Sequence, residues 1–292
     1  MNKNNAKDTF FSRNHSLNCR GRLFSLEEPR IMGILNITPD SFYDGGRYTD
    51  PQAARDRCTE MVNEGADIID IGAASSRPGA AIMDPEEEIN RLIPVVSSIR
   101  ETYPDLVLSI DTYHAFVAKR MIEDFNVDII NDISAGELDP GMIPLIIKKN
   151  VPYIIMHMKG VPGDMQDQPQ YSNVTDEVIR YFSEKVHLLH EHGVSDVLID
   201  PGFGFGKTLD HNYELLSQFN AFQIFELPLV AGVSRKSMIY KLLETKSEEA
   251  LNGSTAVHMI LLQKGVNILR VHDVRPAKEA VSIFLKSLGK GY

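Results

Sequence analysis

Short apolar runs rich in β-branched residues recur along the chain from Ile31 onward, and longer amphipathic stretches lie between them. This alternation is typical of repeated strand–helix units around a parallel sheet. Eight repeats favour a closed (β/α)8 barrel, the TIM barrel, over an open doubly wound sheet, and 292 residues suit one such α/β domain. The runs are Ile31–Ile37, Asp67–Ile71, Leu106–Asp111, Asp128–Asn131, Pro152–Met156, Val197–Asp200, Leu229–Ala231 and Asn267–Val271. The helical patterns include Pro51–Asn63, Pro85–Glu101, Ala115–Phe125, Val174–His192 and Ala277–Leu288.

The composition narrows the class of partner. Hydrophobic residues make up 43% of the chain, enough for a substantial core, and the formal net charge of −10 disfavours binding to nucleic acid or to an anionic membrane surface. Only Cys19 and Cys58 occur, too few for a disulfide scaffold, which fits a reducing compartment. No stretch approaches the roughly 18 apolar residues of a membrane span. We therefore expect a cytoplasmic protein that acts on small molecules.

The domain limits follow from where the alternation begins. The first 28 residues are polar and contain no apolar run of signal-peptide length. Residues 1–28 are therefore predicted to be an extension of unassigned role, and residues 29–292 are predicted to form the barrel domain.

Polar residues follow the predicted strands at the points where the strands end. In a barrel the carboxyl ends of all eight strands meet at one face, which carries the active site in characterised barrel enzymes. Any single polar residue can simply mark a strand end, but a set in register is a stronger signal. We expect the set to surround one cavity. Its members are Asn36, Arg77, Asp111, Asn131, His157, Asp200, Lys236, Arg270 and His272.

The first two predicted strands lead into loops that can cover such a cavity. The first loop continues from Asn36 through Asp40, Phe42 and Asp44. These residues either simply form turns or are polar ligands on a mobile loop over the cavity. The second loop, Gly72–Gly79, contains small residues and one arginine, Arg77, whose forked donors suit phosphate oxygens, unless Arg77 is merely solvent-exposed.

Two carboxylates and an amide are predicted at the floor of the barrel mouth. Apolar residues immediately precede Asp111 and Asp200, and a carboxylate so placed loses hydration unless it has partners or a function. Together with the amide of Asn131 they would suit a flat heterocycle that carries amino and ring N–H groups. A metal site of two aspartates is the alternative, although no tight cluster of histidines and carboxylates supports zinc.

Three further segments bear on anion binding. The run Gly202–Thr208 does not fit the phosphate-binding loop, because Gly202 stands one residue too close to Gly206, and its alternating glycines do not fit the dinucleotide fingerprint. Gly232–Ser237 precedes a helical pattern and offers serines and cations, as an anion site or as simple capping. Arg270 and His272 stand two apart on one side of an extended chain and could hold a pyrophosphate.

Taken together, these segments resemble the dihydropteroate synthase family of pterin-binding barrels. The match runs from about Ile31 to the C-terminus, in the family's order, and the combination is specific. The resemblance implies a transferase that condenses 6-hydroxymethyl-7,8-dihydropterin pyrophosphate with p-aminobenzoate, giving 7,8-dihydropteroate in folate biosynthesis. It also implies Mg2+ as cofactor, a homodimer and sensitivity to sulfonamides. The motifs are Leu35–Phe42, Ser76–Gly79, Ser109–Thr112, Ile130–Asp132, Asp200–Lys207, Gly232–Ser237 and Arg270–His272.

The resemblance also implies roles for individual residues. It assigns catalysis to Asp111, Asp200, Lys236, Arg270 and His272. It places the pterin on Asp111, Asn131, Met156, Asp200, Phe205 and Lys236. It places the pyrophosphate on Asn36, Arg77, Arg270 and His272, with Asn36 also a ligand of Mg2+. It places p-aminobenzoate on Phe42, Ser76, Pro78, Lys236 and Ser237.

An aryl amine is a weak nucleophile, so departure of pyrophosphate before amine attack is the expected route. Asp111 and Asp200 would stabilise the cation that develops on the pterin, and the cationic residues would stabilise the leaving group. One departure from the family lies in the second loop, where Glu-Ser-Thr-Arg-Pro-Gly is frequent. Here Ala74 replaces the acid and Ser76 replaces the threonine, so the fit of p-aminobenzoate analogues is less predictable.

Two other functions use a similar pocket. A barrel that presents methyltetrahydrofolate for methyl transfer shares the aspartate and asparagine floor but needs no pyrophosphate site, so Arg77, Lys236, Arg270 and His272 argue against it. A non-catalytic pterin-binding homologue would be expected to lose loop residues such as Asn36, Asp40 or Arg77, and all three are present.

Overall fold

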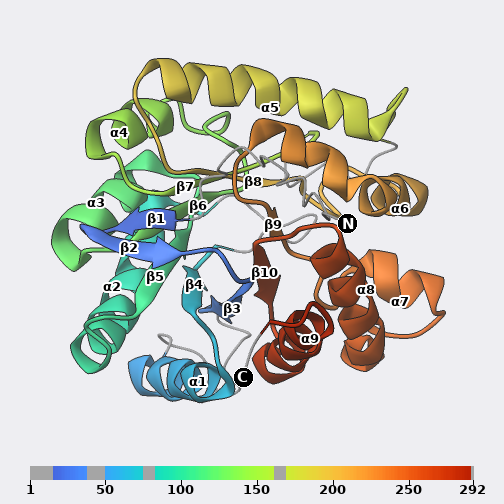
Figure 1. Cartoon of the computed structure of the whole chain (residues 1–292). Helices are drawn as coiled ribbons and strands as arrows, with labels where there is room; N and C mark the ends of the chain where they lie inside the picture. The colour runs from blue at the N-terminus through green and yellow to red at the C-terminus, as the bar shows by residue number, and fades with distance from the viewer. Residues whose placement is uncertain (1–15, 38–49, 75–82, 161–168, 291–292) are drawn as a thin grey trace, which may run out of the picture.

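Eight parallel strands form a closed barrel in the computed structural model, which describes residues 16–37, 50–74, 83–160 and 169–290. The strand order is β8-β7-β6-β5-β4-β3-β10-β9, and a parallel bridge between Ile199 and Leu229 joins the two ends of the sheet. Helices surround the strands (Figure 1). The predicted (β/α)8 barrel is therefore confirmed.

The observed elements lie close to the predicted ranges. The β9 strand is shorter than the predicted run that begins at Leu229, and α9 begins at Val274 rather than at Ala277. The barrel strands are β3 (Arg30–Asn36), β4 (Ile68–Gly72), β5 (Val107–Asp111), β6 (Ile129–Asp132), β7 (Tyr153–Met156), β8 (Val197–Asp200), β9 (Val230–Ala231) and β10 (Ile268–Val271). The helices are α1 (Pro51–Glu64), α2 (Pro85–Thr102), α3 (Ala115–Phe125), α4 (Met142–Lys149), α5 (Val174–Glu191), α6 (Leu209–Ser217), α7 (Ser237–Leu242), α8 (Leu251–Gln263) and α9 (Val274–Ser287), with 3-10 turns at Phe219–Phe225 and Ser247–Glu249.

Local sequence signals set the starts of α1 and α2. Asp50 and Asp84 are the N-caps, and the side chain of Asp50 accepts a hydrogen bond from the backbone N–H of Gln52. Pro51 and Pro85 occupy the first helical positions, where a missing N–H costs no intrahelical bond. These caps fix where the chain enters the helix after each of the first two barrel loops.

The interior of the barrel changes from apolar to polar along the strands. Residues on the same face of each strand point inward, so they form layers. Above the first layer, the register places Asp70 beside Ser109, and Asp111 beside Asn131. The polar groups therefore lie toward the carboxyl ends of the strands, on an apolar floor. The floor consists of Met32, Ile68, Val107, Ile129, Ile154, Leu198, Val230 and Ile268, one from each strand.

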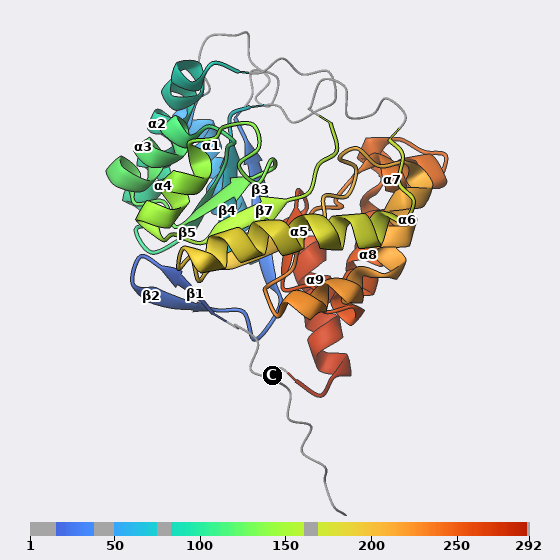
Figure 2. The same cartoon turned by 90° about the horizontal axis from the view of Figure 1, so that it is seen from above.

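A β-hairpin to which the sequence assigned no role closes the opposite end of the barrel. It consists of β1 (Ser16–Cys19) and β2 (Arg22–Ser25), paired antiparallel. Leu17, Cys19 and Leu26 are buried and pack against the apolar floor from below. Figure 2 shows the hairpin at one end of the barrel, away from α7. Since the floor residues would otherwise meet water, the hairpin completes the core.

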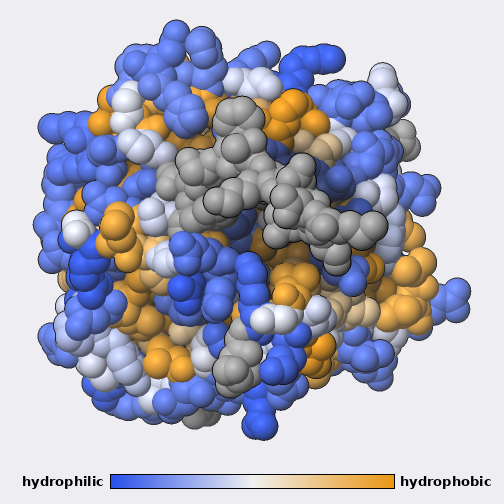
Figure 3. Space-filling model, viewed as in Figure 1, coloured by the Kyte–Doolittle hydropathy of each residue, from blue (hydrophilic) through white to orange (hydrophobic). Residues whose placement is uncertain are grey.

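The helices α7, α8 and α9 leave apolar side chains exposed. Leu242 and Leu243 at the end of α7 are each 53% exposed, and Ile283 on α9 is 64% exposed. Leu251 and Ile260 on α8 are also among the exposed apolar residues. Figure 3 shows apolar surface at its right edge, over α7. Within the described ranges, no helix is both long and apolar enough to cross a membrane.

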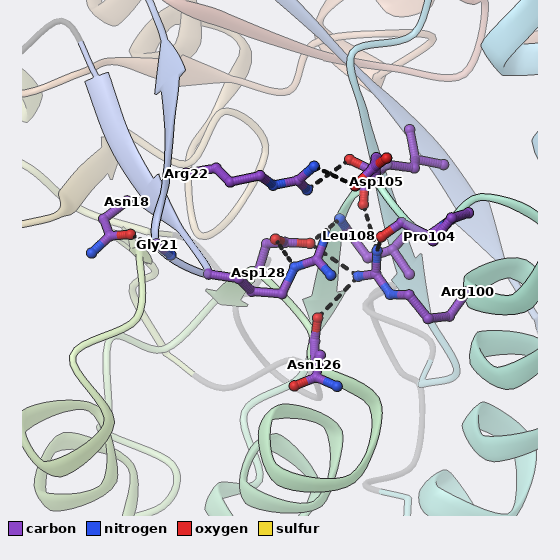
Figure 4. Close-up of polar contacts among 11 residues, drawn as sticks. Asn18, Gly21, Arg22, Arg100, Pro104, Asp105, Leu108, Asn126 and Asp128 are labelled. Carbon is purple, nitrogen blue, oxygen red and sulfur yellow. Dashed lines mark hydrogen bonds and ion pairs between the residues drawn. The ribbon is translucent and has the colours of Figure 1, made fainter.

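Asp128, directly before β6, fastens the hairpin to the barrel (Figure 4). Its Oδ1 accepts from Arg20 Nε at 2.6 Å, and its Oδ2 accepts from Arg100 Nη2 at 3.0 Å and from the backbone N–H of Leu108 at 2.9 Å. The Asp128 side chain is fully buried. One carboxylate therefore ties together the hairpin, α2 and β5.

Candidate active site

Neighbouring strands place several of the predicted site residues side by side. The register pairs Asn36 with Gly72, Gly72 with Asp111, and Asp111 with Asn131. A Cβ atom at Gly72 would lie 3.6 Å from Asp111 Oδ2 and 3.7 Å from Asn36 Oδ1. Gly72 therefore leaves space between the exposed amide of Asn36 and the largely buried carboxylate of Asp111 at the mouth of the barrel.

Arg270 connects two carboxylates, Asp70 and Asp111. Its Nε donates to Asp70 Oδ2 at 2.6 Å, and its Nη2 donates to Asp111 Oδ2 at 2.6 Å. Burial alone would lower the pKa of Arg270, but Asp70 and Asp111 outweigh burial and raise it. Burial raises the pKa of Asp111 to about 7, and Arg270 opposes that rise. The charge of Asp70, the other carboxylate that shares this guanidinium, adds a smaller rise to the pKa of Asp111.

Asn131 is oriented by the same buried carboxylate. Its Nδ2 donates to Asp70 Oδ2 at 3.0 Å. Since the amide nitrogen is directed to Asp70, the amide oxygen is left to accept hydrogen bonds from a ligand. The site therefore presents an acceptor at Asn131, next to the carboxylate of Asp111.

Asp200 and Lys236 form the other polar side of the pocket. The Asp200 carboxylate accepts from the backbone N–H of Gly202 at 2.8 Å, and burial raises its pKa while Lys236 opposes the rise. Lys236 Nζ donates to the carbonyl of Phe203 at 2.6 Å. Burial lowers the pKa of Lys236 to about 8, against the opposing effect of Asp200. The lysine is thus a cation whose charge can be lost in mildly alkaline solution.

An apolar wall accompanies these polar groups. Met156 pairs with Asp200 across β7 and β8 and is buried. It packs in a small cluster with Tyr113, Ile133 and Met158, against which Phe205 also lies. The ring of Phe205 has Lys236 Nζ 4.5 Å from its centroid. Polar edges beside a flat apolar wall suit a planar, hydrogen-bonding heterocycle.

The loop after β8 is held by a buried lysine. Lys207 Nζ makes hydrogen bonds with His157 Nδ1 at 3.0 Å and with the carbonyls of His157, Gly202 and Phe205 at 3.2, 2.9 and 3.0 Å. Because these protein acceptors occupy the ammonium, Lys207 is not free to bind a phosphate. The glycine run therefore shapes the pocket and positions Phe205.

Comparisons with known proteins agree with this geometry. A family model described as pterin binding enzyme matches residues 32–272. The chain is 42% identical to dihydropteroate synthase of Escherichia coli (strain K12) over 266 residues, which are 90% of this chain and 93% of that protein. It is 38% identical to dihydropteroate synthase of Haemophilus influenzae over 270 residues, covering 92% and 97%. The chain belongs to the pterin-binding enzyme family.

Solved structures extend the comparison for this pterin-binding enzyme. The dihydropteroate synthase of Yersinia pestis, in a complex with a sulfonamide drug, aligns with a TM-score of 0.88 at 39% identity, covering 94% of this chain and 99% of that chain. The dihydropteroate synthase of Xanthomonas albilineans, solved with 4-aminobenzoic acid, aligns with a TM-score of 0.87 at 37% identity, covering 95% and 99%. The predicted family is confirmed.

His272 and Ser237 lie beside the pocket of this family member. The backbone N–H of His272 donates to Ser234 Oγ at 3.3 Å, and its carbonyl accepts from Arg57 Nη2 at 3.0 Å. His272 keeps an exposed surface, and partial desolvation of its ring, with Arg270 as the next cause, lowers the pKa of the imidazole. The imidazole is therefore neutral near pH 7, where the sequence left both forms open. Ser237 begins α7, directly after Lys236.

The pocket also contains residues that are absent from the predicted set. Asp70 is fully buried in the middle of an apolar run, where its charge was the only signal. Tyr113 and Ile133 follow predicted strand ends but gave no chemical signal, and Lys207 was considered only within a phosphate-binding loop whose spacing fails. Four predicted residues, Phe42, Ser76, Arg77 and Pro78, lie outside the described residues.

Proposed function

We propose that this pterin-binding enzyme is a dihydropteroate synthase, a transferase of folate biosynthesis. It condenses 6-hydroxymethyl-7,8-dihydropterin pyrophosphate with p-aminobenzoate and releases pyrophosphate and 7,8-dihydropteroate. The observation that carries the proposal is the pair of carboxylates, Asp200 buried and Asp111 only 16% exposed, set with one amide and two cations at a single barrel mouth. The named relatives, one solved with 4-aminobenzoic acid, support the same reaction.

In this proposal the pterin ring lies between the polar side chains at the barrel mouth and the apolar wall that includes Met156 and Phe205. Its amino and ring N–H groups donate to Asp111, Asp200 and the amide oxygen of Asn131, while Lys236 donates to a ring acceptor. Met156 and Phe205 contact the faces of the ring. These assignments are supported by the burial of Asp200 and by the low exposure of Asp111, because a carboxylate shielded from water gains from further hydrogen-bond donors.

The pyrophosphate is proposed to lie between Arg270, His272 and Asn36, with Arg77 from the second loop. Arg270 supplies fixed N–H donors, and the imidazole of His272 supplies an N–H donor. Charge-assisted hydrogen bonds to the leaving group favour its departure.

Mg2+ is proposed to accompany the pyrophosphate, with Asn36 as its protein ligand. Mg2+ prefers oxygen donors and usually binds through one or two protein oxygens together with phosphate and water. Asn36 fits because it is exposed at the end of β3 and has open space beside its Oδ1. When bound, the ion would help to neutralise the pyrophosphate. The described residues hold no group of three or more His, Cys, Asp or Glu that could bind a metal, so phosphate oxygens would supply much of the coordination.

Different residues then stabilise the positive and the negative charge that develop during the reaction. As the bond to pyrophosphate breaks, positive charge spreads over the dihydropterin, and the carboxylates of Asp111 and Asp200 stabilise it. Negative charge grows on the leaving group, where Arg270 and His272 donate hydrogen bonds. The amine of p-aminobenzoate then attacks the exocyclic carbon, and the new C–N bond forms as the nitrogen loses a proton to water. No covalent intermediate with the protein is needed.

The second substrate is proposed to lie over Lys236 and Ser237. The start of α7 offers backbone N–H groups toward its carboxylate. Phe42, Ser76 and Pro78 complete this subsite in the proposal. Sulfonamides would compete here, a proposal supported by the drug complex of the Yersinia pestis relative.

We further propose a cytoplasmic homodimer. The exposed apolar residues on α7, α8 and α9 support an interface, because contacts between subunits cover exposed apolar side chains. The measurement is the mass in solution by light scattering across a dilution series. A monomer at micromolar concentration would contradict the dimer.

The function is tested by incubating the purified protein with 6-hydroxymethyl-7,8-dihydropterin pyrophosphate, p-aminobenzoate and Mg2+. We expect pyrophosphate and dihydropteroate in equal amounts. Pyrophosphate without dihydropteroate would place the defect in the amine subsite, with the loop at Ala74 and Ser76 as the first segment to vary. A protein that binds pterin but releases neither product would support a binding-only or methyl-transfer function instead.

A further inference from the structure

Asp70 is a fully buried carboxylate in the interior of the barrel. It lies on β4, fully buried, in the layer directly below Gly72 and Asp111. One oxygen, Oδ2, accepts both Arg270 Nε at 2.6 Å and Asn131 Nδ2 at 3.0 Å. The other oxygen, Oδ1, is buried and has no hydrogen-bond partner among the described residues. Both of its donors thus come from residues to which the proposed function gives a ligand.

A purely structural carboxylate at this position is poorly explained. Burial of an ionised carboxylate is costly even with a cationic partner, and one unsatisfied oxygen adds to that cost. The layer beneath Asp70 is filled with apolar side chains from all eight strands, which form the barrel core without charge. Retaining a carboxylate here is more readily explained by what it does to the residues above it.

The first effect concerns the amide of Asn131. An amide side chain can present either its oxygen or its nitrogen to a pocket, and its neighbours decide which. The carboxylate of Asp70 only accepts, so it selects the orientation in which Nδ2 points down and Oδ1 faces the pocket. Asn131 is therefore fixed as an acceptor for a ligand N–H.

The second effect concerns the guanidinium of Arg270. Asp70 holds Nε from the layer below, while Nη2 reaches up to Asp111 in the layer above. Because the guanidinium is planar, fixing Nε fixes the plane in which the remaining N–H groups lie. The N–H groups that can meet a ligand anion are therefore presented in one orientation.

From these contacts we propose that Asp70 is a positioning residue that couples the two halves of the dihydropterin pyrophosphate site through a single oxygen atom. The proposal rests on the proposed function, which assigns Asn131 to the pterin and Arg270 to the pyrophosphate. Asp70 itself touches neither half. Its removal should weaken both, whereas loss of Asn131 or Arg270 should weaken mainly one.

The main test is a double-mutant cycle with Asp70→Asn and Asn131→Ala. Asp70→Asn keeps the size of the side chain and removes the charge. The binding of 6-hydroxymethyl-7,8-dihydropterin and of inorganic pyrophosphate is measured separately by calorimetry. We expect Asp70→Asn to weaken both ligands about tenfold or more, as for hydrogen bonds to charged groups. We expect Asn131→Ala to cost about tenfold in pterin affinity with Asp70 present but only about threefold or less in the Asp70→Asn background, since coupled residues are not additive.

The matched control is Ser109→Ala. Ser109 is the register neighbour of Asp70 in the same layer, is fully buried, and its hydroxyl has no hydrogen-bond partner among the described residues. This substitution perturbs the layer without removing a hydrogen bond of that hydroxyl, and it should leave both affinities unchanged. Losses in Ser109→Ala equal to those in Asp70→Asn, or an Asn131→Ala effect that is the same in both backgrounds, would overturn the proposal.

A second variant covers the case in which Asp70→Asn does not fold. Asn131→Asp keeps an acceptor oxygen toward the pocket but places a second carboxylate against Asp70. The proposal requires the contact from Nδ2 to Asp70, so pterin affinity should fall about tenfold or more. Unchanged affinity would overturn it. Wild-type protein that binds pterin and pyrophosphate without turnover would contradict the proposed function. The double-mutant cycle could still be measured, because it depends only on binding affinities. Wild-type protein that binds neither ligand would overturn both proposals.

Discussion

Arg270 Nη2 lies 2.6 Å from Asp111 Oδ2, although 159 residues separate the two along the chain. The contact joins β10 to β5 across the barrel, and Asp70 accepts a hydrogen bond from Nε of the same guanidinium. In the ligand-free protein Arg270 is therefore an internal counter-ion. A bound pyrophosphate would compete with Asp111 for its Nη atoms.

This arrangement predicts a selective effect of Arg270→Ala. The affinity for the pyrophosphate ester should fall by on the order of 1.5–3 kcal/mol, about 10- to 150-fold, because charge-assisted hydrogen bonds to the ester are lost. Calorimetry should show a much smaller change for the bare pterin. Arg270→Lys serves as the control, since it retains the charge but loses the fork that reaches two carboxylates. Equal losses for ester and bare pterin would contradict the assignment of Arg270 to the pyrophosphate.

The lowered pKa of Lys236 predicts that activity declines in alkaline solution. Burial lowers its pKa to about 8, so the ammonium is present below that pH and is lost as the pH rises through it. Because kcat/KM reports groups of the free enzyme, kcat/KM for the pterin ester should decline above about pH 8. In Lys236→Arg the charge persists, so the decline should move to higher pH even if the rate is lower. An unchanged alkaline limb in Lys236→Arg would assign the ionisation to another group or to the ligand.

Much of this architecture could be predicted because strand and helix periodicities differ and because barrel chemistry gathers at strand ends. Asp111, Asn131 and Asp200 follow apolar runs, and the barrel geometry alone brings them together. Asp70 could not be found in the same way, since it lies inside its run. Besides the charge itself, the alternation of inward positions, Ile68, Asp70 and Gly72, indicates that this carboxylate faces the polar interior.

The hairpin and the buried lysine escaped prediction for a different reason. The strands of the hairpin are only four residues long. The charged residues Arg20 and Arg22 interrupt the apolar pattern, so the sequence does not indicate that Leu17 and Cys19 point inward. Lys207 follows a glycine run that suggested phosphate binding before its spacing was considered. Its actual partners include carbonyl groups, which no side-chain pattern encodes.

The loop that Lys207 stabilises predicts a steric effect at Gly202. Gly202 has φ +73°, and a Cβ atom there would lie 2.0 Å from the carbonyl oxygen of His157. Gly193 has φ +79°, and a Cβ atom there would meet nothing within 4 Å, so Gly193→Ala isolates the cost of the left-handed backbone, about 1–2 kcal/mol. Gly202→Ala should lower the free energy of unfolding by more and should also weaken pterin binding, because the Gly202 N–H orients Asp200. Denaturant titration and calorimetry measure the two effects, and equal destabilisation by both substitutions would show that the loop can move aside.

The ion pairs below the barrel predict how firmly the hairpin is held. Asp128 is fully buried and accepts from Arg20, Arg100 and Leu108, so Asp128→Ala leaves two buried or half-buried guanidinium groups without their carboxylate. We expect a loss of about 3–5 kcal/mol in the free energy of unfolding, as for removal of one partner of a buried pair.

The matched control for Asp128 is Arg22→Ala in the same hairpin. Arg22 pairs with Asp105 at 2.6 Å, but the two side chains are 46% and 87% exposed. An exposed pair contributes only about 0–1 kcal/mol, because water and salt screen it and its side chains lose entropy. Urea titrations of the two variants at equal pH compare them directly. A large effect of Arg22→Ala with a small effect of Asp128→Ala would mean that the hairpin is held by its exposed edge rather than by the buried carboxylate.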